Sequence, residues 1–259
     1  SLVGDFGKSL EEVLTRYQPE RVIIEPSGVG KLSDVMNAVR DVAKNLEVRL
    51  NSAVTIVDAC KCKMYMKNFG EFFNNQVENA GTIVLSRTDV ADAKKVQADV
   101  ELLRAHNSSA SIVTTPVEQL TGSQLLALIE KPDTMMEELL AQVEEEHHHH
   151  EHDENCTCGC HDHNHDHHAD EVFSSWGMET AAPITREKLE AILVDLSETT
   201  VYGDVLRAKG MLPTEKAGEW LYFDLVPEEY EIREGQPEYT GKVCVIGARL
   251  KEEELSQSH

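Results

Sequence analysis

The segment from residue 22 to residue 34, VIIEPSGVGKLSD, has residues suited to a phosphate-binding turn. A phosphate loop of the form G-x-x-x-x-G-K-[ST] uses glycines so that backbone N–H groups surround a phosphate, and a hydroxyl that binds Mg²⁺. If Gly30 and Lys31 were its G-K pair, the first glycine would be Glu25 and the hydroxyl residue would be Leu32. Both positions are wrong for such a loop, so we expect Gly30 and Lys31 to begin a helix instead.

Glu25 and Gly28 suit a different role in nucleotide chemistry. An acid at the carboxyl end of a strand can orient Mg²⁺ or its water, and a following glycine lets the backbone approach a γ-phosphate. The apolar run Val22-Ile23-Ile24 predicts a strand directly before Glu25. On spacing alone, the alternative that this strand simply ends in a turn stays open.

A second polar group, Ser86-Arg87-Thr88-Asp89, follows another apolar run. Guanine-specific proteins carry N-K-x-D in this place, where the Asp carboxylate accepts hydrogen bonds from guanine N1–H and the exocyclic amine. The planar guanidinium of Arg87 can replace Lys in stacking on the purine, whereas Ser86 lacks the amide of Asn. Ser86, Arg87 and Asp89 are therefore candidate guanine-binding residues. In the alternative, Thr88 and Asp89 only cap a helix that begins near Val90.

A tract rich in Cys and His between residues 144 and 171 has the composition of a transition-metal site. Thiolates and imidazoles suit Zn²⁺, Ni²⁺, Co²⁺ or copper rather than Mg²⁺ or Ca²⁺. Its Cys-x-Cys spacing is tighter than that of rigid structural zinc sites, which favours a labile site. The alternatives are an adventitious polar linker or, for residues 147–150, a purification tag. The candidate ligands are Cys156, Cys158, Cys160, His161, His163, His165 and His167.

The remaining cysteines have less specific surroundings. Cys60 and Cys62 form a further C-x-C pair that could bind metal beside a nucleotide, but a semi-buried pair without that role is favoured. Cys244 lies in an apolar run and is expected to pack in a core. Clustered cysteines beside histidines indicate metal binding rather than disulfides, and thus a reducing cytoplasm.

Alternating strands and helices must position the nucleotide-binding residues. Four apolar runs predict strands that are buried on both faces, because they do not alternate with polar residues: residues 22–25, 53–58, 82–86 and 111–115. Helices are expected between them, at residues 31–46, 63–79, 92–106 and 122–130. This order predicts a doubly wound, mostly parallel α/β sheet over residues 1–143, with ligands at the carboxyl ends of its strands.

The pattern changes at residue 144. Residues 144–171 are almost entirely His, acid and Cys and cannot bury an apolar face, so we expect a solvated, metal-binding linker. Residues 172–259 predict a second, smaller α+β domain. Its expected strands are 172–180, 205–209, 220–225 and 242–247, and its expected helices are 185–196, with Thr185 as N-cap, and one beginning at 251.

Charge and hydropathy exclude two classes of partner. The 259 residues carry a formal net charge of -23, which argues against nucleic acid as the main partner, because phosphate binding relies on Lys and Arg. No apolar run approaches the length of a membrane span, so no membrane partner is expected. Metal cations are plausible ligands for such an acidic protein.

The order of these motifs resembles one known family. The sequence IIEPSG, then TIVDA, then VLSRTD, then an acidic His-rich linker and a C-terminal domain containing RAKG at 207–210, is similar to the CobW-like GTPases, a metal-handling branch of the P-loop GTPases. The resemblance implies a P-loop GTPase fold, with Glu25 positioning Mg²⁺ and Gly28 facing the γ-phosphate of GTP. Arg87 would stack on guanine and Asp89 would read it.

The resemblance also implies elements that these residues lack. The family's phosphate loop and its C-x-C-C motif precede the E-x-x-G strand, and the chain begins with Ser1 rather than Met. We therefore expect that the first strand, the phosphate loop and the cysteine motif have been lost by truncation, and that this fragment hydrolyses GTP poorly.

The implied function is a GTP-dependent metallochaperone. It would deliver zinc, or else cobalt or nickel, to a client metalloprotein or a cofactor-synthesis protein, and self-association into a homo-oligomer is compatible with this role. The alternatives are a non-catalytic metal-binding or storage protein on a nucleotide-binding fold, and an interaction scaffold whose C-terminal domain docks clients.

Overall fold

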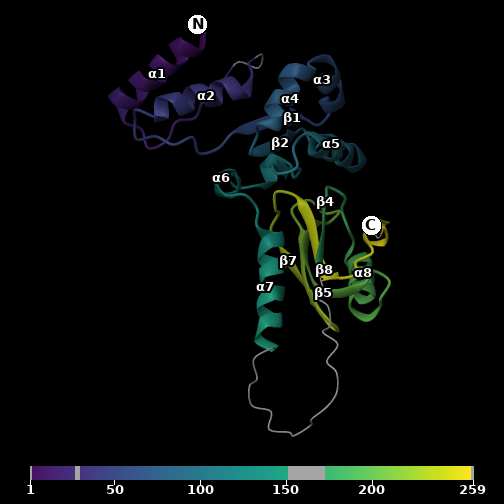
Figure 1. Ribbon diagram of the computed structural model, residues 1–259. Helices are drawn as coiled ribbons and strands as arrows, with labels where there is room; N and C mark the ends of the chain where they lie inside the picture. The colour runs from purple at the N-terminus through teal and green to yellow at the C-terminus, as the bar shows by residue number, and fades with distance from the viewer. Residues whose placement is uncertain (1, 27–29, 151–172, 258–259) are drawn as a thin grey trace. The chain divides into compact units, whose positions relative to one another are not determined.

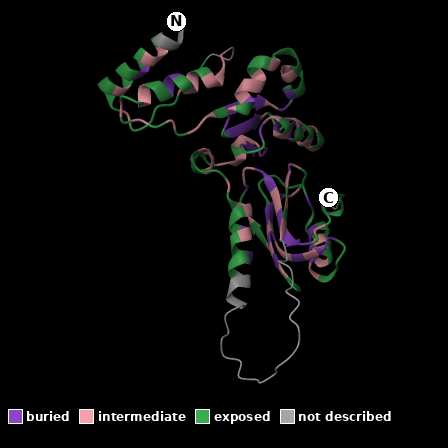
Figure 2. Cartoon of the chain, in the orientation of Figure 1, coloured by how far each residue is buried: buried purple, intermediate pink, exposed green. Residues whose placement is uncertain are grey.

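The computed structural model describes residues 2–26, 30–150 and 173–257. The chain divides into two compact units, Ser1–Asp133 and Thr134–His259. Figure 1 shows the elements of each unit, and Figure 2 shows that buried residues concentrate in the strands of both units.

The first unit is built on a small parallel sheet. Its strands, in the spatial order β1-β2-β3, are Val54–Asp58, Thr82–Ser86 and Ser111–Val113. Every residue of β2 except the last is buried, as expected for a central strand of a parallel sheet. The predictions of strands at 53–58, 82–86 and 111–115 are thereby confirmed, with β3 shorter than expected.

Helices follow the strands, as the sequence predicts. α5 (Ala93–His106) and α6 (Gly122–Glu130) confirm two of the expected helices, and a short 3₁₀ helix, η1 (Val117–Gln119), precedes α6. The expected helix at 63–79 is two helices, α3 (Cys62–Asn68) and α4 (Gly70–Glu78). The break falls at Phe69-Gly70, where glycine weakens a helix.

Two predictions about strands are wrong. Residues 22–25 do not form a strand, and Ile23 is 88% exposed. β1 is not buried on both faces, because Thr55 and Val57 are buried whereas Val54 and Ile56 are exposed. A β-branched run is only a strand when its backbone finds a pairing partner, and no strand of the described residues pairs with residues 22–25 or with the second edge of β1.

A helical pair precedes the sheet in the sequence. α1 (Leu2–Tyr17), which the sequence analysis did not predict, packs against α2 (Leu32–Ala43), which confirms the helix expected at 31–46. Leu10 of α1 and Ala38 and Val39 of α2 are buried. Both helices are otherwise mostly exposed or half-buried (Figure 2).

The second unit contains an antiparallel sheet with the spatial order β4-β8-β5-β6-β7. Its strands are Ser174–Thr180, Asp204–Pro213, Trp220–Val226, Glu229–Gly235 and Gly241–Ala248 for β4 to β8. Its C-terminal helices are α8 (Arg186–Glu198) and α9 (Glu252–Gln257). The predicted α+β domain is confirmed, including Thr185 as N-cap, whose hydroxyl accepts from Lys188 N.

β7 was not predicted, because its sequence EYEIREG is mostly charged. It lies at the end of the sheet and pairs only with β6, and charged side chains are common on such edge strands.

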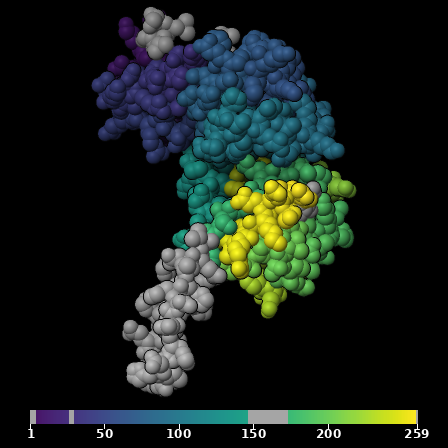
Figure 3. Space-filling model, turned by 45° about the vertical axis from the view of Figure 1, so that its right-hand side comes forward, coloured from purple at the N-terminus to yellow at the C-terminus, as the bar shows by residue number. Residues whose placement is uncertain are grey.

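Helices cover both faces of this sheet (Figure 1). Val245 of β8 lies in the core beneath α8, with Leu189, Leu193 and Phe223. Its neighbour Cys244 points to the other face, as alternation in a strand requires, and packs against α7. Cys244 is thus a core residue, as expected. In the space-filling view the yellow C-terminal residues lie on the surface of this unit (Figure 3).

The helix α7 (Met135–His150) places the boundary between the units before residue 134 rather than at the expected residue 143. Leu139 and Val143, four residues apart on one helical face, are buried against β8. α7 also runs through 144–150, which the sequence analysis assigned to the linker, whereas 151–171 lie outside the described residues.

Gly210, the last residue of the RAKG sequence, is required by close packing. A Cβ at this position would collide with the ring of Phe223 and with the carbonyl oxygen of Lys242 on the neighbouring strand. Only glycine allows this approach.

In the described part of the chain, no helix is long and apolar enough to cross a membrane.

Candidate nucleotide-binding site

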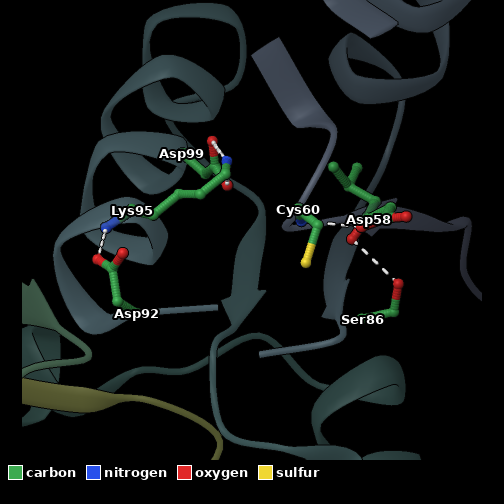
Figure 4. A network of polar contacts seen from close by, with 7 residues as sticks. Asp58, Cys60, Ser86, Asp92, Lys95 and Asp99 are labelled. Atoms are coloured by element: carbon green, nitrogen blue, oxygen red, sulfur yellow. Dashed lines mark hydrogen bonds and ion pairs between the residues drawn. The ribbon is translucent and has the colours of Figure 1, made fainter. Parts of the chain in front are cut away.

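The polar residues at the carboxyl edge of the parallel sheet lie together. Asp58, the last residue of β1, is in register with Ser86, the last residue of β2, and the Ala59 N–H donates to the Ser86 carbonyl at 3.0 Å. Ligands of open α/β sheets bind at this edge. Asp58 and Ser86 therefore mark the position of a candidate ligand site (Figure 4).

Asp58 organises the two loops that leave this edge. Its Oδ1 accepts a 2.8 Å hydrogen bond from the Cys60 N–H, which closes the turn after β1. Its Oδ2 lies 3.3 Å from Nη1 of Arg87. Asp58 is not among the residues predicted for the site, although an acid at the end of a second parallel strand was the available signal.

The S-R-T-D loop adopts a compact turn. Arg87 has a φ of 63°, in the left-handed region that non-glycine residues seldom occupy. Its carbonyl accepts from the N–H groups of Val90 and Ala91 at 3.2 and 3.1 Å. Ser86 Oγ donates to the Val57 carbonyl at 3.4 Å. Backbone strain of this kind is stored where the surrounding structure holds it, often at functional sites.

The loop does not cap the helix that follows it. α5 begins at Ala93, and its N-cap is Asp92, whose carboxylate accepts from the Lys95 N–H at 2.8 Å. The alternative in which Thr88 and Asp89 cap a helix near Val90 is therefore wrong. The Asp89 side chain is exposed, so its carboxylate is accessible to a ligand.

A buried acid and thiol lie behind this edge. Asp99 of α5 is 2% exposed and accepts from Lys95 Nζ at 3.2 Å. Burial raises the pKa of the Asp99 carboxyl. Burial, with a smaller contribution from the negative charge of Asp99, also raises the pKa of the Cys62 thiol to about 12. Cys62 therefore stays protonated at neutral pH.

The C-x-C pair after β1 is divided between the surface and the core. Cys60 is exposed and Cys62 is fully buried. No group of three or more potential His, Cys, Asp or Glu ligands occurs among the described residues. The exposure of Cys60 and the burial of Cys62 fit the expectation of a semi-buried pair.

The E-x-x-G residues are not brought to this edge by a strand. Glu25 is exposed, and Gly28 lies outside the described residues. Lys31 is paired with Glu71 of α4 at 2.6 Å and precedes α2, which fits the expectation that Gly30 and Lys31 introduce a helix. The seven candidate metal ligands between Cys156 and His167 also lie outside the described residues.

The first unit has a parallel sheet with polar loops at its carboxyl edge, and an antiparallel α+β unit follows it. This combination is that of a nucleotide-binding α/β protein with an appended domain. The family model of the CobW/HypB/UreG nucleotide-binding domain matches residues 1–114, and that of the cobalamin synthesis protein cobW C-terminal domain matches residues 173–258. The chain therefore belongs to the CobW family of P-loop GTPases.

Two solved structures are similar to the chain. The crystal structure of Zn(II)-bound YjiA GTPase from E. coli is 19% identical, covers 96% of this chain and 73% of that chain, and has a TM-score of 0.39. A Zn(II)-bound triple mutant of YjiA GTPase is 20% identical, with the same coverage of 96% and 73% and a TM-score of 0.38. A comparison with curated proteins gives no match.

Proposed function

We propose that this chain carries the guanine-binding half and the C-terminal domain of a GTP-hydrolysing metallochaperone. One observation supports this most strongly: the S-R-T-D loop stands at the carboxyl edge of the parallel sheet, and Asp89 is exposed while Asp92 caps the helix. The Asp89 carboxylate is thus available to accept from guanine N1–H and the exocyclic amine.

The other residues of the loop would support guanine binding. The ion pair with Asp58 holds the Arg87 guanidinium beside this loop, where its planar group can stack on a purine. Ser86 supplies a hydroxyl where an Asn amide is the more usual donor. Glu25 would orient Mg²⁺, which neutralises charge on the β- and γ-phosphates when bound, and Gly28 would admit the γ-phosphate.

The metal would be collected by the Cys/His tract. The ligand set at Cys156, Cys158, Cys160 and the histidines up to His167 suits zinc first, with cobalt or nickel as other metals of the same ligand chemistry. GTP binding and hydrolysis would bias the protein between a metal-holding and a metal-releasing conformation. The recipient would be a client metalloprotein or cofactor-synthesis protein of a reducing cytoplasm.

The sharpest test exchanges the base. Asn in place of Asp89 can accept from N1–H but presents an amide donor where guanine also has a donor, so D89N should lose GTP affinity and gain affinity for xanthosine triphosphate, whose 2-oxo group accepts. The matched control is D92N, which removes the same charge three residues away and keeps a good N-cap. If D89N binds GTP as tightly as wild type does, and also binds xanthosine triphosphate no more tightly than wild type does, Asp89 does not read guanine.

Turnover must be measured with a phosphate loop present. No G-x-x-x-x-G-K-[ST] sequence occurs in the 259 residues, so we expect this chain alone to show little hydrolysis and the intact gene product to hydrolyse GTP, with Zn²⁺ altering the rate. Absence of a phosphate loop from the gene, or of turnover with and without Zn²⁺, would contradict the proposal.

A non-catalytic metal-storage protein is the second candidate, favoured by Ser86 in place of Asn. It predicts that the intact gene product binds Zn²⁺ at micromolar or tighter affinity and shows no GTP turnover. Deleting residues 147–168 should abolish metal uptake in both cases. If client docking is lost with that deletion as well, an independent scaffold role for the C-terminal domain is excluded.

A further inference from the structure

Asp58 is fixed more firmly than the cation with which it pairs. Its side chain is 19% exposed, whereas that of Arg87 is 54% exposed. Oδ1 of Asp58 accepts from the Cys60 N–H at 2.8 Å, within the turn that follows β1, and its Oδ2 accepts from Nη1 of Arg87 at 3.3 Å. Because one carboxylate oxygen bonds to the backbone, the other has a set orientation toward the guanidinium. Figure 4 shows Asp58 beside Cys60 and Ser86 at this edge of the sheet.

The backbone of Arg87 fixes the other end of its side chain. Arg87 directly follows β2, and its φ of 63° turns the chain away from the direction of the strand. Its carbonyl accepts from the N–H groups of Val90 and Ala91, which closes the turn. The register of Asp58 with Ser86 then places a carboxylate of the neighbouring strand within reach of the guanidinium. A long side chain is thus held both at its backbone and at its charged end.

Most of the guanidinium remains available to a ligand. In the described part of the chain, Asp58 is the one side chain that forms a hydrogen bond or ion pair with Arg87. A single contact through Nη1 leaves the flat face of the guanidinium free to stack on a purine. Stacking is tolerant of base identity, because every base has a π-face. Arg87 therefore suits affinity for purines in general, whereas Asp89 suits the choice among them.

We propose that Asp58 is a positioning residue for purine stacking. Through the ion pair it holds the Arg87 guanidinium in the orientation in which the flat face meets the base, and it does not touch the nucleotide itself. Loss of the pair leaves the guanidinium free to rotate, so the affinities for different purine nucleotides fall by the same factor. This inference rests on the proposed GTP-binding function and divides the roles within its site: Asp58 and Arg87 set the strength of purine binding, and Asp89 sets its selectivity.

The test measures dissociation constants of the intact gene product for two ligands, GDP and inosine diphosphate, by titration calorimetry. Neither ligand has a γ-phosphate to be hydrolysed during the titration. Inosine diphosphate lacks only the exocyclic amine, so it loses one of the two hydrogen bonds proposed for Asp89 and keeps the stacking face. The ratio of the two affinities therefore reports base selection, and their common change reports stacking.

The variants separate the ion pair from the turn. D58N keeps an oxygen that can accept from the Cys60 N–H but loses the charge that holds Arg87. D58S removes the same charge, and its hydroxyl can close the same turn, so it is a second, independent variant. R87A removes the stacking group itself. D92N is the matched control, because it removes the charge of a nearby acid and keeps a good N-cap for α5.

We expect D58N and D58S to weaken the binding of both ligands equally, by about fivefold, because a partly exposed ion pair makes a modest contribution. R87A should weaken both about tenfold. Adding D58N to R87A should change the affinities less than about twofold further, since Asp58 acts through Arg87. D92N should stay within about twofold of wild type. At about 1 M salt the difference between wild type and D58N should narrow, because salt screens the pair.

Other outcomes overturn the inference in distinguishable ways. If D58N and D58S bind both ligands as tightly as wild type does, the ion pair does not position a binding group. If D58N is as harmful in the R87A background as in wild type, Asp58 acts by closing its turn and not through Arg87. If D58N changes the ratio of the two affinities, Asp58 takes part in base selection.

Failure of the proposed function gives a different result. If wild type binds neither GDP nor inosine diphosphate, the proposed function fails and the inference fails with it. If D89N changes the ratio of the two affinities while D58N and D58S leave both unchanged, guanine reading stands and only the role of Asp58 is wrong.

Discussion

The two sheets of this protein are stabilised in different ways. The five-stranded antiparallel sheet of the second unit has α7 on one face and α8 on the other, and its core is apolar. The three-stranded parallel sheet of the first unit leaves Ile56 of β1 71% exposed. There, buried polar side chains that bond to backbone groups, such as Asn107, connect helices to strands. Both units bury apolar side chains, and the first unit in addition buries more polar side chains, which join its helices to its strands.

The largest expected effect is in the apolar core of the second unit. Phe223 is 2% exposed, so F223A should cost about 3–5 kcal/mol of the unfolding free energy of that unit through lost burial and a cavity. Both tryptophans, Trp176 and Trp220, lie in this unit, so urea unfolding followed by tryptophan fluorescence measures it directly. The control F69A changes a residue that is 57% exposed and should leave this transition unchanged.

The next effect should be in the first unit, where Asn107 joins α4 to the start of β3. Its Nδ2 donates to the Val77 and Ala80 carbonyls at 2.8 and 2.9 Å, and its Oδ1 accepts from the Ala110 N–H at 2.9 Å. N107A should cost about 3 kcal/mol, because buried backbone groups lose their partners. Faster hydrogen exchange in β2 and β3 would report it. Exposed N68A is the control, and equal exchange in both variants would contradict the prediction.

The buried thiol of Cys62 makes the stability of the first unit depend on alkaline pH. The pKa of the Cys62 thiol is raised from 9.0 to about 12, so between these values the folded state keeps a proton that the unfolded state loses. Below pH 9 the thiol is protonated in both states, and its contribution to the unfolding free energy is fully present. Above pH 9 this contribution is lost as the pH rises, and at pH 10.5 the loss is about 2 kcal/mol. Thermal unfolding by circular dichroism at pH 8 and 10.5 should show a larger loss in wild type and in C60A than in C62A.

The smallest expected effect is at the exposed face of β1. I56T keeps a β-branched side chain on a strand position that is 71% exposed, so its stability should stay within about 0.5 kcal/mol of wild type. Chemical denaturation of the 259-residue chain measures it. A loss above about 1 kcal/mol would mean that this face is covered in the folded chain and would weaken the contrast between the two sheets.

Local patterns were enough to predict many elements. The apolar run at 82–86 predicted β2, because a strand buried on both faces must be apolar at every position. Thr185 predicted the start of α8, because an N-cap hydroxyl acts within three residues. The S-R-T-D loop and Asp89 were selected from their chemistry together with the resemblance to the CobW-like GTPases, and the structure places the loop at the carboxyl end of β2.

Patterns failed where a distant partner decides the outcome. Val22, Ile23 and Ile24 have strand propensity but no pairing strand in the described residues. The charged β7 has weak propensity but pairs with β6. The bonds between Asn75 and Ser33 span 42 residues, and no local rule indicates which amide will meet which helix.

The sequence by itself indicated the family and the order of strands and helices over most of the chain, and it selected the residues that are proposed to bind guanine and metal, because these depend on residue type and short spacing. Only the tertiary structure decided that Asp92 rather than Asp89 caps α5, that Cys62 is buried beside Asp99, and that α7 packs on the C-terminal sheet. Each of these depends on burial or on contact with a distant segment, which a linear pattern does not contain.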